Sequence, residues 1–229
     1  MKALILNSGT GSRMGDLTKN NPKCMTELST NETIISRQLR QLSKIGIEEI
    51  IITTGKYDEK IKKHCLSLSL PLKFHFIKND LYDKTNYIYS IYLAKHLLES
   101  DIISLHGDLV FDSKVLEEMP INCMAISSKA KIPEKDFKAV LKDDKIIKVG
   151  INFFENSVMA QPMYKLEKDK WLKWLENISI FCGAGKTNVY AEDALNIEID
   201  PFDFEDLLCA EIDTKEDLEV INERITSLR

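Results

Sequence analysis

The chain has 229 residues, with 31 Lys and Arg against 36 Asp and Glu, which gives a formal net charge of -5. This length suits one domain with one good core, and we expect residues 1–229 to form it. The acidic balance argues against nucleic acid as a partner, because a basic surface usually binds its phosphates. No apolar run approaches the roughly 20 residues of a membrane span, so no membrane partner is expected. Five scattered cysteines without a C-x-x-C pair favour a reduced, cytoplasmic setting.

Short β-branched runs alternate with stretches of helical period along the first 106 residues. The runs are apolar without clean alternation, as expected for parallel strands covered on both faces: residues 2–6, 49–54, 73–77 and 101–106. Between them the apolar spacing predicts one helix that Asn31 caps and Gly46 closes, and further helices over 57–68 and 85–98. This order predicts an α/β, Rossmann-like fold with a mostly parallel central sheet flanked by helices.

The pattern changes from about residue 120. Residues 122–127 and 139–159 are β-rich, and a helix is predicted over 166–180. Because no Pro/Gly/Ser-rich linker divides this part from the rest, we expect about 120–185 to be a small β-rich insertion within the single domain. Near the end, Asp213-Thr-Lys-Glu216 is a capping-box pattern that predicts the start of a terminal helix.

A glycine-rich segment follows the first predicted strand without a break. Such a turn lets backbone N–H groups approach a phosphate at the carboxyl edge of the sheet. The spacing is not that of a P-loop, and a dinucleotide-binding fold would need glycine in place of Met14. Taken alone, the segment could be an ordinary βα turn. The residues expected to hold the phosphates are Asn7, Ser8, Gly9, Thr10, Gly11, Ser12 and Arg13.

Arg13 ends this loop and Pro22-Lys23 follows, which gives the pattern G-x-G-[ST]-R-M-x(7)-P-K. With this pattern the sequence resembles the nucleotidyltransferases of the sugar-nucleotide type, in which the stretch holds the triphosphate of an NTP. The resemblance implies that Arg13 and Lys23 are catalytic residues. They would offset the negative charge that grows on the departing pyrophosphate.

His106-Gly107-Asp108 closes the fourth predicted strand. In the resembled family the corresponding strand-end aspartate binds magnesium, which implies that Asp108 is a catalytic residue and a metal ligand. Gly107 would let the backbone come close to the nucleotide, and the structural alternative for Asp108 is a turn or helix cap. By match to the downstream acidic motif of the family, we expect Glu192 to be the second Mg²⁺ ligand, with Asp193 as the alternative.

The stretch from Asp83 to Tyr92 carries the next motif. Asn86 and Ser90 are four apart on one face of a helix, where short polar side chains can reach a base or ribose, although Asn86 could simply cap the helix. The motif T-N-x-x-x-S resembles the CTP-using branch, namely the phosphocholine and 2-aminoethylphosphonate cytidylyltransferases. The resemblance is strongest over 1–28, 80–112 and 188–218.

In the resembled enzymes the region of residues 133–138 meets the acceptor, and the resemblance implies acceptor binding there, on the insertion side. Phe137 and Tyr190 are aromatic candidates for a cationic head group, whereas Asp136 and Lys138 suit a zwitterion. The phosphocholine enzymes carry tryptophan where this chain has Ala191, which disfavours choline. A charged, solvated turn is the alternative.

These motifs together predict a Mg²⁺-dependent cytidylyltransferase. It would transfer CMP from CTP to a small phosphonate or phosphomonoester and release pyrophosphate. We expect 2-aminoethylphosphonate as the acceptor, with phosphocholine as the first alternative. A sugar-1-phosphate nucleotidyltransferase and a non-catalytic nucleotide-binding regulator are the others. The sequence does not indicate the oligomeric state.

Overall fold

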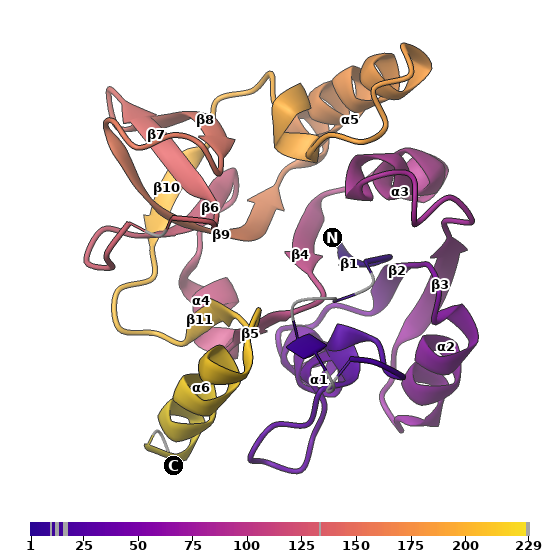
Figure 1. The fold of residues 1–229 in the computed structure, drawn as a ribbon. Helices are drawn as coiled ribbons and strands as arrows, with labels where there is room; N and C mark the ends of the chain where they lie inside the picture. The colour runs from indigo at the N-terminus through magenta and orange to yellow at the C-terminus, as the bar shows by residue number, and fades with distance from the viewer. Residues whose placement is uncertain (10, 12–13, 16–17, 133, 228–229) are drawn as a thin grey trace.

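The computed structural model describes residues 1–9, 11, 14, 15, 18–132 and 134–227. Their centre is a sheet in which seven strands run in the order β10-β6-β9-β4-β1-β2-β3, with β7 and β8 branching off at β9. The strands β3, β2, β1 and β4 are parallel neighbours. The mostly parallel sheet between helices confirms the predicted α/β, Rossmann-like class (Figure 1). The four parallel strands are β1 (Lys2–Asn7), β2 (Glu49–Thr54), β3 (Lys73–Lys78) and β4 (Ile102–His106).

Alternation along β1 assigns the two faces of the sheet. Leu4 packs in the same core cluster as residues of α3 and α5, whereas Ala3 and Ile5 pack with residues of α1, α2 and α4. Successive side chains of a strand point to opposite faces, so one apolar strand contributes side chains to the core on both faces of the sheet. The helices are α1 (Ile34–Lys44), α2 (Asp58–Ser67), α3 (Tyr87–Ala94), α4 (Ser113–Glu118), α5 (Lys168–Gly183) and α6 (Lys215–Ser227).

The predicted cap of α1 is wrong by two residues. The N–H of Ser36 donates to Thr33 Oγ1 at 3.2 Å, so Thr33 caps the helix. Asn31 instead has a φ of +60° in the turn before it. Gly46, with a φ of +80°, follows the end of the helix as predicted. Asn and Thr both suit N-caps, and the sequence analysis named only Asn31.

The segment from about residue 120 extends the central sheet. Its β9 pairs antiparallel with both β4 and β6, and β7 and β8 form a hairpin beside β9. The sequence analysis placed the start of β9 in the β-rich run 139–159. It did not predict that β9 is a strand of the central sheet. The elements of this segment are β6 (Cys123–Ser127), β7 (Lys138–Lys142), β8 (Lys145–Gly150), β9 (Ser157–Leu166) and α5.

Short elements complete the fold around the ends of β4 and β6. Strand β10 (Asp200–Asp203) pairs parallel with β6. Strands β5 (Leu109–Phe111) and β11 (Cys209–Glu211) form a separate antiparallel pair. The 3-10 helices include η2 (Lys23–Met25), η3 (Lys95–Leu97) and η4 (Ala191–Ala194). None of the helices in the described part of the chain is both long and apolar enough to cross a membrane.

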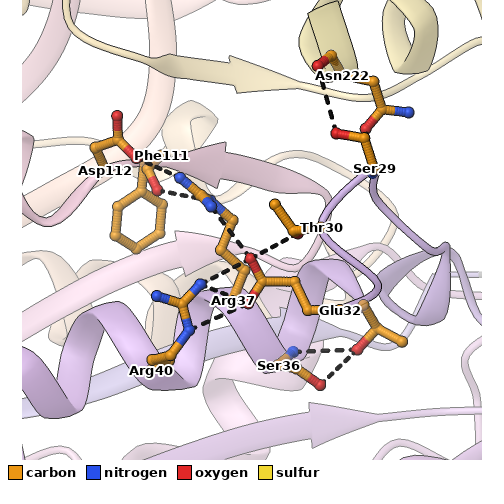
Figure 2. A network of polar contacts seen from close by, with 10 residues as sticks. Ser29, Thr30, Glu32, Ser36, Arg37, Arg40, Phe111, Asp112 and Asn222 are labelled. Carbon is orange, nitrogen blue, oxygen red and sulfur yellow. Dashed lines mark hydrogen bonds and ion pairs between the residues drawn. The ribbon is translucent and has the colours of Figure 1, made fainter. Parts of the chain in front are cut away.

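A buried arginine ties the segment before α1 to the end of β5 (Figure 2). Arg37 donates to Glu32 Oε1 at 3.2 Å and to the carbonyl of Phe111 at 3.3 Å, and it forms an ion pair with Asp112. Arg40 donates to the same Glu32 carboxylate, at 3.1 Å from Nε. Because β5 follows directly after β4, this network anchors the chain just beyond the carboxyl end of β4.

Candidate active site

A cavity of about 310 Å³ lies at the carboxyl ends of β1 and β4. Ligands of open α/β sheets bind at this edge, outside the ends of the parallel strands. The wall carries both signs of charge and several aromatic rings. The residues that the arguments below use are Asn7, Ser8, Lys23, Tyr82, Asn86, Tyr87, His106, Gly107, Asp108, Asp136, Phe137, Tyr190, Glu211 and Asp213.

The predicted phosphate loop borders this cavity wherever the structure describes it. Asn7, Ser8, Gly9 and Gly11 line the wall. Gly11 has a φ of +68°, and a Cβ there would lie 3.1 Å from the Cβ of Lys23, so glycine lets the loop pass close to the lysine. The predicted residues Thr10, Ser12 and Arg13 lie outside the described residues.

Gly107 is required by the side chain of Asn7. A Cβ on Gly107 would lie 1.7 Å from Asn7 Oδ1, far inside contact distance. The Nδ2 of Asn7 is buried and has no hydrogen-bond partner among the described residues. An unpaired buried donor is costly, so this amide is suited to a polar ligand in the cavity.

Lys23 brings two distant carboxylates together. Its ammonium donates to Asp108 Oδ2 at 2.6 Å and also forms an ion pair with Asp213. Burial alone would lower the pKa of Lys23, but the two carboxylates outweigh burial and raise that pKa. For Asp108, burial would raise the pKa, yet Lys23 and His106 hold it below its usual value. Lys23 is therefore a firmly charged group that contacts two carboxylates.

Asp213 was missed because its motif was placed one residue too early. The N–H of Asp217 donates to Thr214 Oγ1 at 3.2 Å, and the N–H of Thr214 donates to Asp217 Oδ2 at 2.7 Å. The capping box is thus Thr214 to Asp217, not Asp213 to Glu216. This shift leaves the carboxylate of Asp213 outside the cap, where it reaches Lys23.

A histidine and a second acid stand beside Asp108. His106 Nδ1 lies 3.1 Å from Glu211 Oε1. Single ligand atoms of His106, Asp108 and Glu211 lie within 4.8 Å of one another, as a metal site would need. Burial and the charge of Asp108 raise the pKa of Glu211 to about 7. Burial would lower the pKa of His106, but the hydrogen bond and charge of Glu211 outweigh it and raise that pKa.

Glu192, the expected second metal ligand, has other contacts. Its Oε1 accepts from the hydroxyl of Tyr164 at 2.9 Å, and its Oε2 accepts from the hydroxyl of Tyr87. It is not in the group of ligand atoms around Asp108. The alternative Asp193 is the third residue of η4, and its side chain accepts from the backbone N–H of the N-cap Tyr190 at 2.9 Å. The structure instead places Asp213 and Glu211 with Asp108.

The two polar residues predicted to hold the nucleoside differ in position. Asn86 lines the cavity and caps α3, its Oδ1 accepting from the N–H of Tyr87 at 2.7 Å. Ser90 is fully buried behind the wall. Its hydroxyl lies 2.8 Å from that of Ser8 and accepts from Asn79 Nδ2 at 3.0 Å. Ser90 therefore supports the phosphate loop from behind instead of facing the cavity.

Three of the four predicted acceptor residues line the cavity: Asp136, Phe137 and Tyr190. Lys138 does not, because its side chain is fully buried. Its ammonium donates to the carbonyls of Asp136 at 2.9 Å and Ile151 at 2.7 Å. Burial lowers the pKa of Lys138. Lys138, which we expected to bind a zwitterionic acceptor, instead holds the acceptor-side segment together.

Aromatic rings gather at this end of the cavity. The ring centroids of Tyr87 and His106 are 4.8 Å apart, and those of Phe137 and Tyr190 are 5.3 Å apart. Tyr87 and Tyr190 are 6.0 Å apart, which joins the two pairs. The sequence analysis indicated Phe137 and Tyr190 as acceptor residues but did not name Tyr87. Such rings suit a cationic ligand group.

Gly55 and Tyr82 were also missed. A Cβ on Gly55 would lie 2.5 Å from the carbonyl oxygen of Ser8 and 2.8 Å from the Cβ of Tyr82. Gly55 therefore lets the loop after β2 approach the phosphate loop and the segment that carries Tyr82. A lone glycine after a strand gives no such signal in the sequence.

Comparison with known proteins identifies relatives of this chain. CMP-5'-(3-aminopropyl)phosphonate synthase of Streptomyces rubellomurinus is 29% identical over 119 residues, which are 52% of this chain and 19% of that protein. CTP:phosphoglutamine cytidylyltransferase of Campylobacter jejuni is 32% identical over 161 residues, covering 65% and 62% of the two chains. Less than two thirds of each of these relatives is thus matched.

Solved structures share the whole fold. CTP:phosphocholine cytidylyltransferase from Streptococcus pneumoniae superposes with a TM-score of 0.77 over 98% of both chains, at 19% identity. The inositol-1-phosphate CTP transferase from T. maritima gives a TM-score of 0.79 at 20% identity, over 97% of this chain and 93% of the other. The family model for nucleotidyl transferases matches residues 2–138, more than half of the sequence. The chain belongs to the nucleotidyl transferase family.

Proposed function

We propose that this protein is a cytidylyltransferase that transfers CMP from CTP to a small phosphonate or phosphomonoester with a cationic group. The observation that carries the proposal is one cavity that joins a phosphate loop, a charged lysine between acids, and a set of aromatic rings. The first two features suit a triphosphate and the third suits the acceptor. The names of the relatives from Streptomyces rubellomurinus and Campylobacter jejuni support CTP as the donor.

The site also fits the magnesium ion that the family implies. The Oδ1 of Asp108 is buried with no hydrogen-bond partner among the described residues. The ammonium of Lys23 shows that the space between Asp108 and Asp213 accepts a positive charge. Carboxylate oxygens are the ligands that Mg²⁺ prefers. We propose Asp108 and Asp213 as the ligands, in place of Asp108 and Glu192. When bound, the ion would neutralise charge on the α-phosphate of CTP.

The chemistry needs alignment more than it needs an acid or base. An acceptor oxygen forms a bond to the α-phosphorus of CTP while the bond between the α-phosphorus and the bridging oxygen breaks, and pyrophosphate leaves. A phosphonate oxygen is already ionised near neutral pH, so no general base has to remove a proton. Lys23 and the loop amides would stabilise the charge that moves onto pyrophosphate. Asn7 and Asn86 supply side-chain amides in the same wall.

The acceptor end favours a small zwitterion. Phe137 and Tyr190 offer aromatic faces, and Asp136 adds negative charge in the same wall. An amino or ammonium group would be attracted by both features. We propose 2-aminoethylphosphonate as the acceptor, and phosphocholine as the alternative that a panel of acceptors would reveal.

Initial rates of pyrophosphate release test this function. The wild type is assayed with Mg²⁺ and with CTP, UTP, ATP or dTTP, each combined with 2-aminoethylphosphonate, phosphocholine or glucose 1-phosphate. We expect CTP with an amine-bearing acceptor to give the highest kcat/KM, and the product mass to equal the CMP conjugate. A preference for a sugar 1-phosphate, or for another nucleotide, would contradict the proposal.

A further inference from the structure

Glu192 is a buried carboxylate whose partners are both neutral. Its side chain is only 6% exposed on the short helix η4. Each of its two oxygens accepts one phenol hydroxyl, from Tyr164 and from Tyr87. In the part of the chain that the structure describes, it makes no ion pair. Two hydroxyls satisfy its hydrogen-bonding capacity in part but leave its negative charge without a cation.

The two phenols stay protonated beside this charge. Burial raises the pKa of Tyr87 well above its usual value, and the neighbouring Glu192 carboxylate raises it further. The same two causes raise the pKa of Tyr164. Both residues are therefore hydroxyl donors to Glu192 at any pH near neutral, and the hydrogen bonds persist while the enzyme works.

Only one of the two phenols reaches the cavity. Tyr87 lines it, with its ring 4.8 Å from that of His106 and 6.0 Å from that of Tyr190. Tyr164 packs against Trp174 at 5.1 Å and is absent from the cavity wall. Glu192 thus stands behind the aromatic wall and is connected to it through Tyr87. A phenol that donates to a carboxylate has a more electron-rich ring, which binds a cation more strongly.

We infer that Glu192 is a specificity-determining residue that selects acceptors with a positively charged end, acting through the ring of Tyr87. This inference rests on the proposed function. Glu192 touches no substrate, so it acts as a positioning and polarising group. The negative charge retained behind Tyr87 attracts a cation in the cavity and leaves a neutral group of the same shape unaffected.

A pair of isosteric acceptors isolates this effect. The enzyme is assayed with CTP, Mg²⁺ and either 2-aminoethylphosphonate or propylphosphonate, in which a methyl replaces the ammonium. Discrimination is the ratio of the two kcat/KM values. We expect Glu192→Gln to lower this ratio about fivefold, the size of a modest cation–π interaction. The loss should lie in the KM of the cationic acceptor, with the KM of CTP unchanged.

Two tyrosine variants complete the test. Tyr87→Phe removes the hydroxyl that links the ring to Glu192, and it should reproduce the fall in discrimination. Tyr164→Phe removes the other donor and keeps the charge and the link, so its ratio should stay within about twofold of the wild type. Thermal unfolding of each variant checks that it is folded, and Tyr87→Phe carries the test if Glu192→Gln does not fold.

The possible results distinguish failure of this inference from failure of the proposed cytidylyltransferase function. Suppose that the wild type turns over the amine-bearing acceptor and that both Glu192→Gln and Tyr87→Phe discriminate as well as the wild type. The role of Glu192 would then be overturned, and the proposed cytidylyltransferase function would stand. An equal loss with both acceptors would show a structural role and would also overturn it. If the wild type turns over neither amine-bearing acceptor, the proposed function fails and the inference fails with it.

Discussion

The ammonium of Lys23 and the carboxylate of Asp108 form an ion pair 2.6 Å long between residues that are 85 positions apart in the sequence. Both side chains are largely buried at the edge of the cavity. The pair joins the chain after the phosphate loop to the turn after β4. It places a cation and an anion where the triphosphate is proposed to lie.

Asp108→Asn should lower turnover sharply while keeping the fold. The amide has nearly the same shape but no charge, so it can neither hold a divalent ion as tightly nor balance Lys23. We expect kcat/KM for CTP to fall by at least about 100-fold, the scale of losing one electrostatic stabiliser. Pyrophosphate release measures the rate, and thermal unfolding confirms the fold. Near-normal turnover in Mg²⁺ would remove Asp108 from the site.

Asp213→Asn should raise the Mg²⁺ concentration needed for half-maximal rate by about tenfold or more, because a proposed ligand loses its charge. The matched control is Glu192→Gln, which removes the charge of the ligand expected from the sequence. We expect its Mg²⁺ requirement to match the wild type. If Glu192→Gln raises the Mg²⁺ concentration needed for half-maximal rate and Asp213→Asn leaves it unchanged, the ligands are Asp108 and Glu192, as expected from the sequence.

Gly107→Ala should destabilise the protein because the new Cβ would meet Asn7 Oδ1 at 1.7 Å. Overpacking of this kind costs about 1–3 kcal/mol of the free energy of unfolding. Urea unfolding measures the loss. The double variant Asn7→Ala with Gly107→Ala removes the clashing side chain and should recover most of it. Additive losses in the double variant would show that the clash is not the cause.

Glu32 should stabilise the fold more at neutral pH than in acid. Burial would raise the pKa of Glu32, but hydrogen bonds from Arg40, Thr30 and Arg37 outweigh burial and lower that pKa below 4.5. A carboxyl with a lowered pKa contributes stability above its unfolded pKa and loses it as pH falls through the folded pKa. Comparing Glu32→Gln with the wild type by urea unfolding should therefore give a difference of about 1–3 kcal/mol at pH 7.

That difference should shrink steadily below about pH 4.5, because the wild-type carboxyl then takes up a proton and resembles the amide. Arg40→Gln is the companion variant, since it removes one partner of Glu32 and leaves Arg37 in place (Figure 2). Arg40→Gln should lower the free energy of unfolding by less than Glu32→Gln does, with the same dependence on pH. A difference between Glu32→Gln and the wild type that stays constant from pH 7 to pH 3 would contradict this account.

The parallel half of the fold could be read from the sequence because its signals are local. Strands β1 to β4 are apolar runs separated by helical periods, and each lies within a residue or two of its predicted position. The phosphate loop and Asp108 follow from such strands, because a strand end fixes where the next residues lie. These parts of the site needed no long-range information.

The other half depends on contacts between distant residues. Strand β9 runs antiparallel between β4 and β6, a pairing that its own sequence does not encode. Asp213 looked like a helix cap until the box proved to be Thr214 to Asp217. Lys138 was expected to bind the acceptor, whereas its ammonium donates hydrogen bonds to backbone carbonyls. Asp213 and Lys138 were both misjudged because the partners of their side chains lie elsewhere in the fold.

The most direct measurement incubates the wild type with CTP, Mg²⁺ and 2-aminoethylphosphonate, follows pyrophosphate, and determines the mass of the organic product. The account predicts equal amounts of pyrophosphate and of a CMP conjugate of the phosphonate. It also predicts much slower release with UTP, ATP or dTTP. No conjugate with any amine-bearing acceptor, or efficient transfer to glucose 1-phosphate, would contradict it.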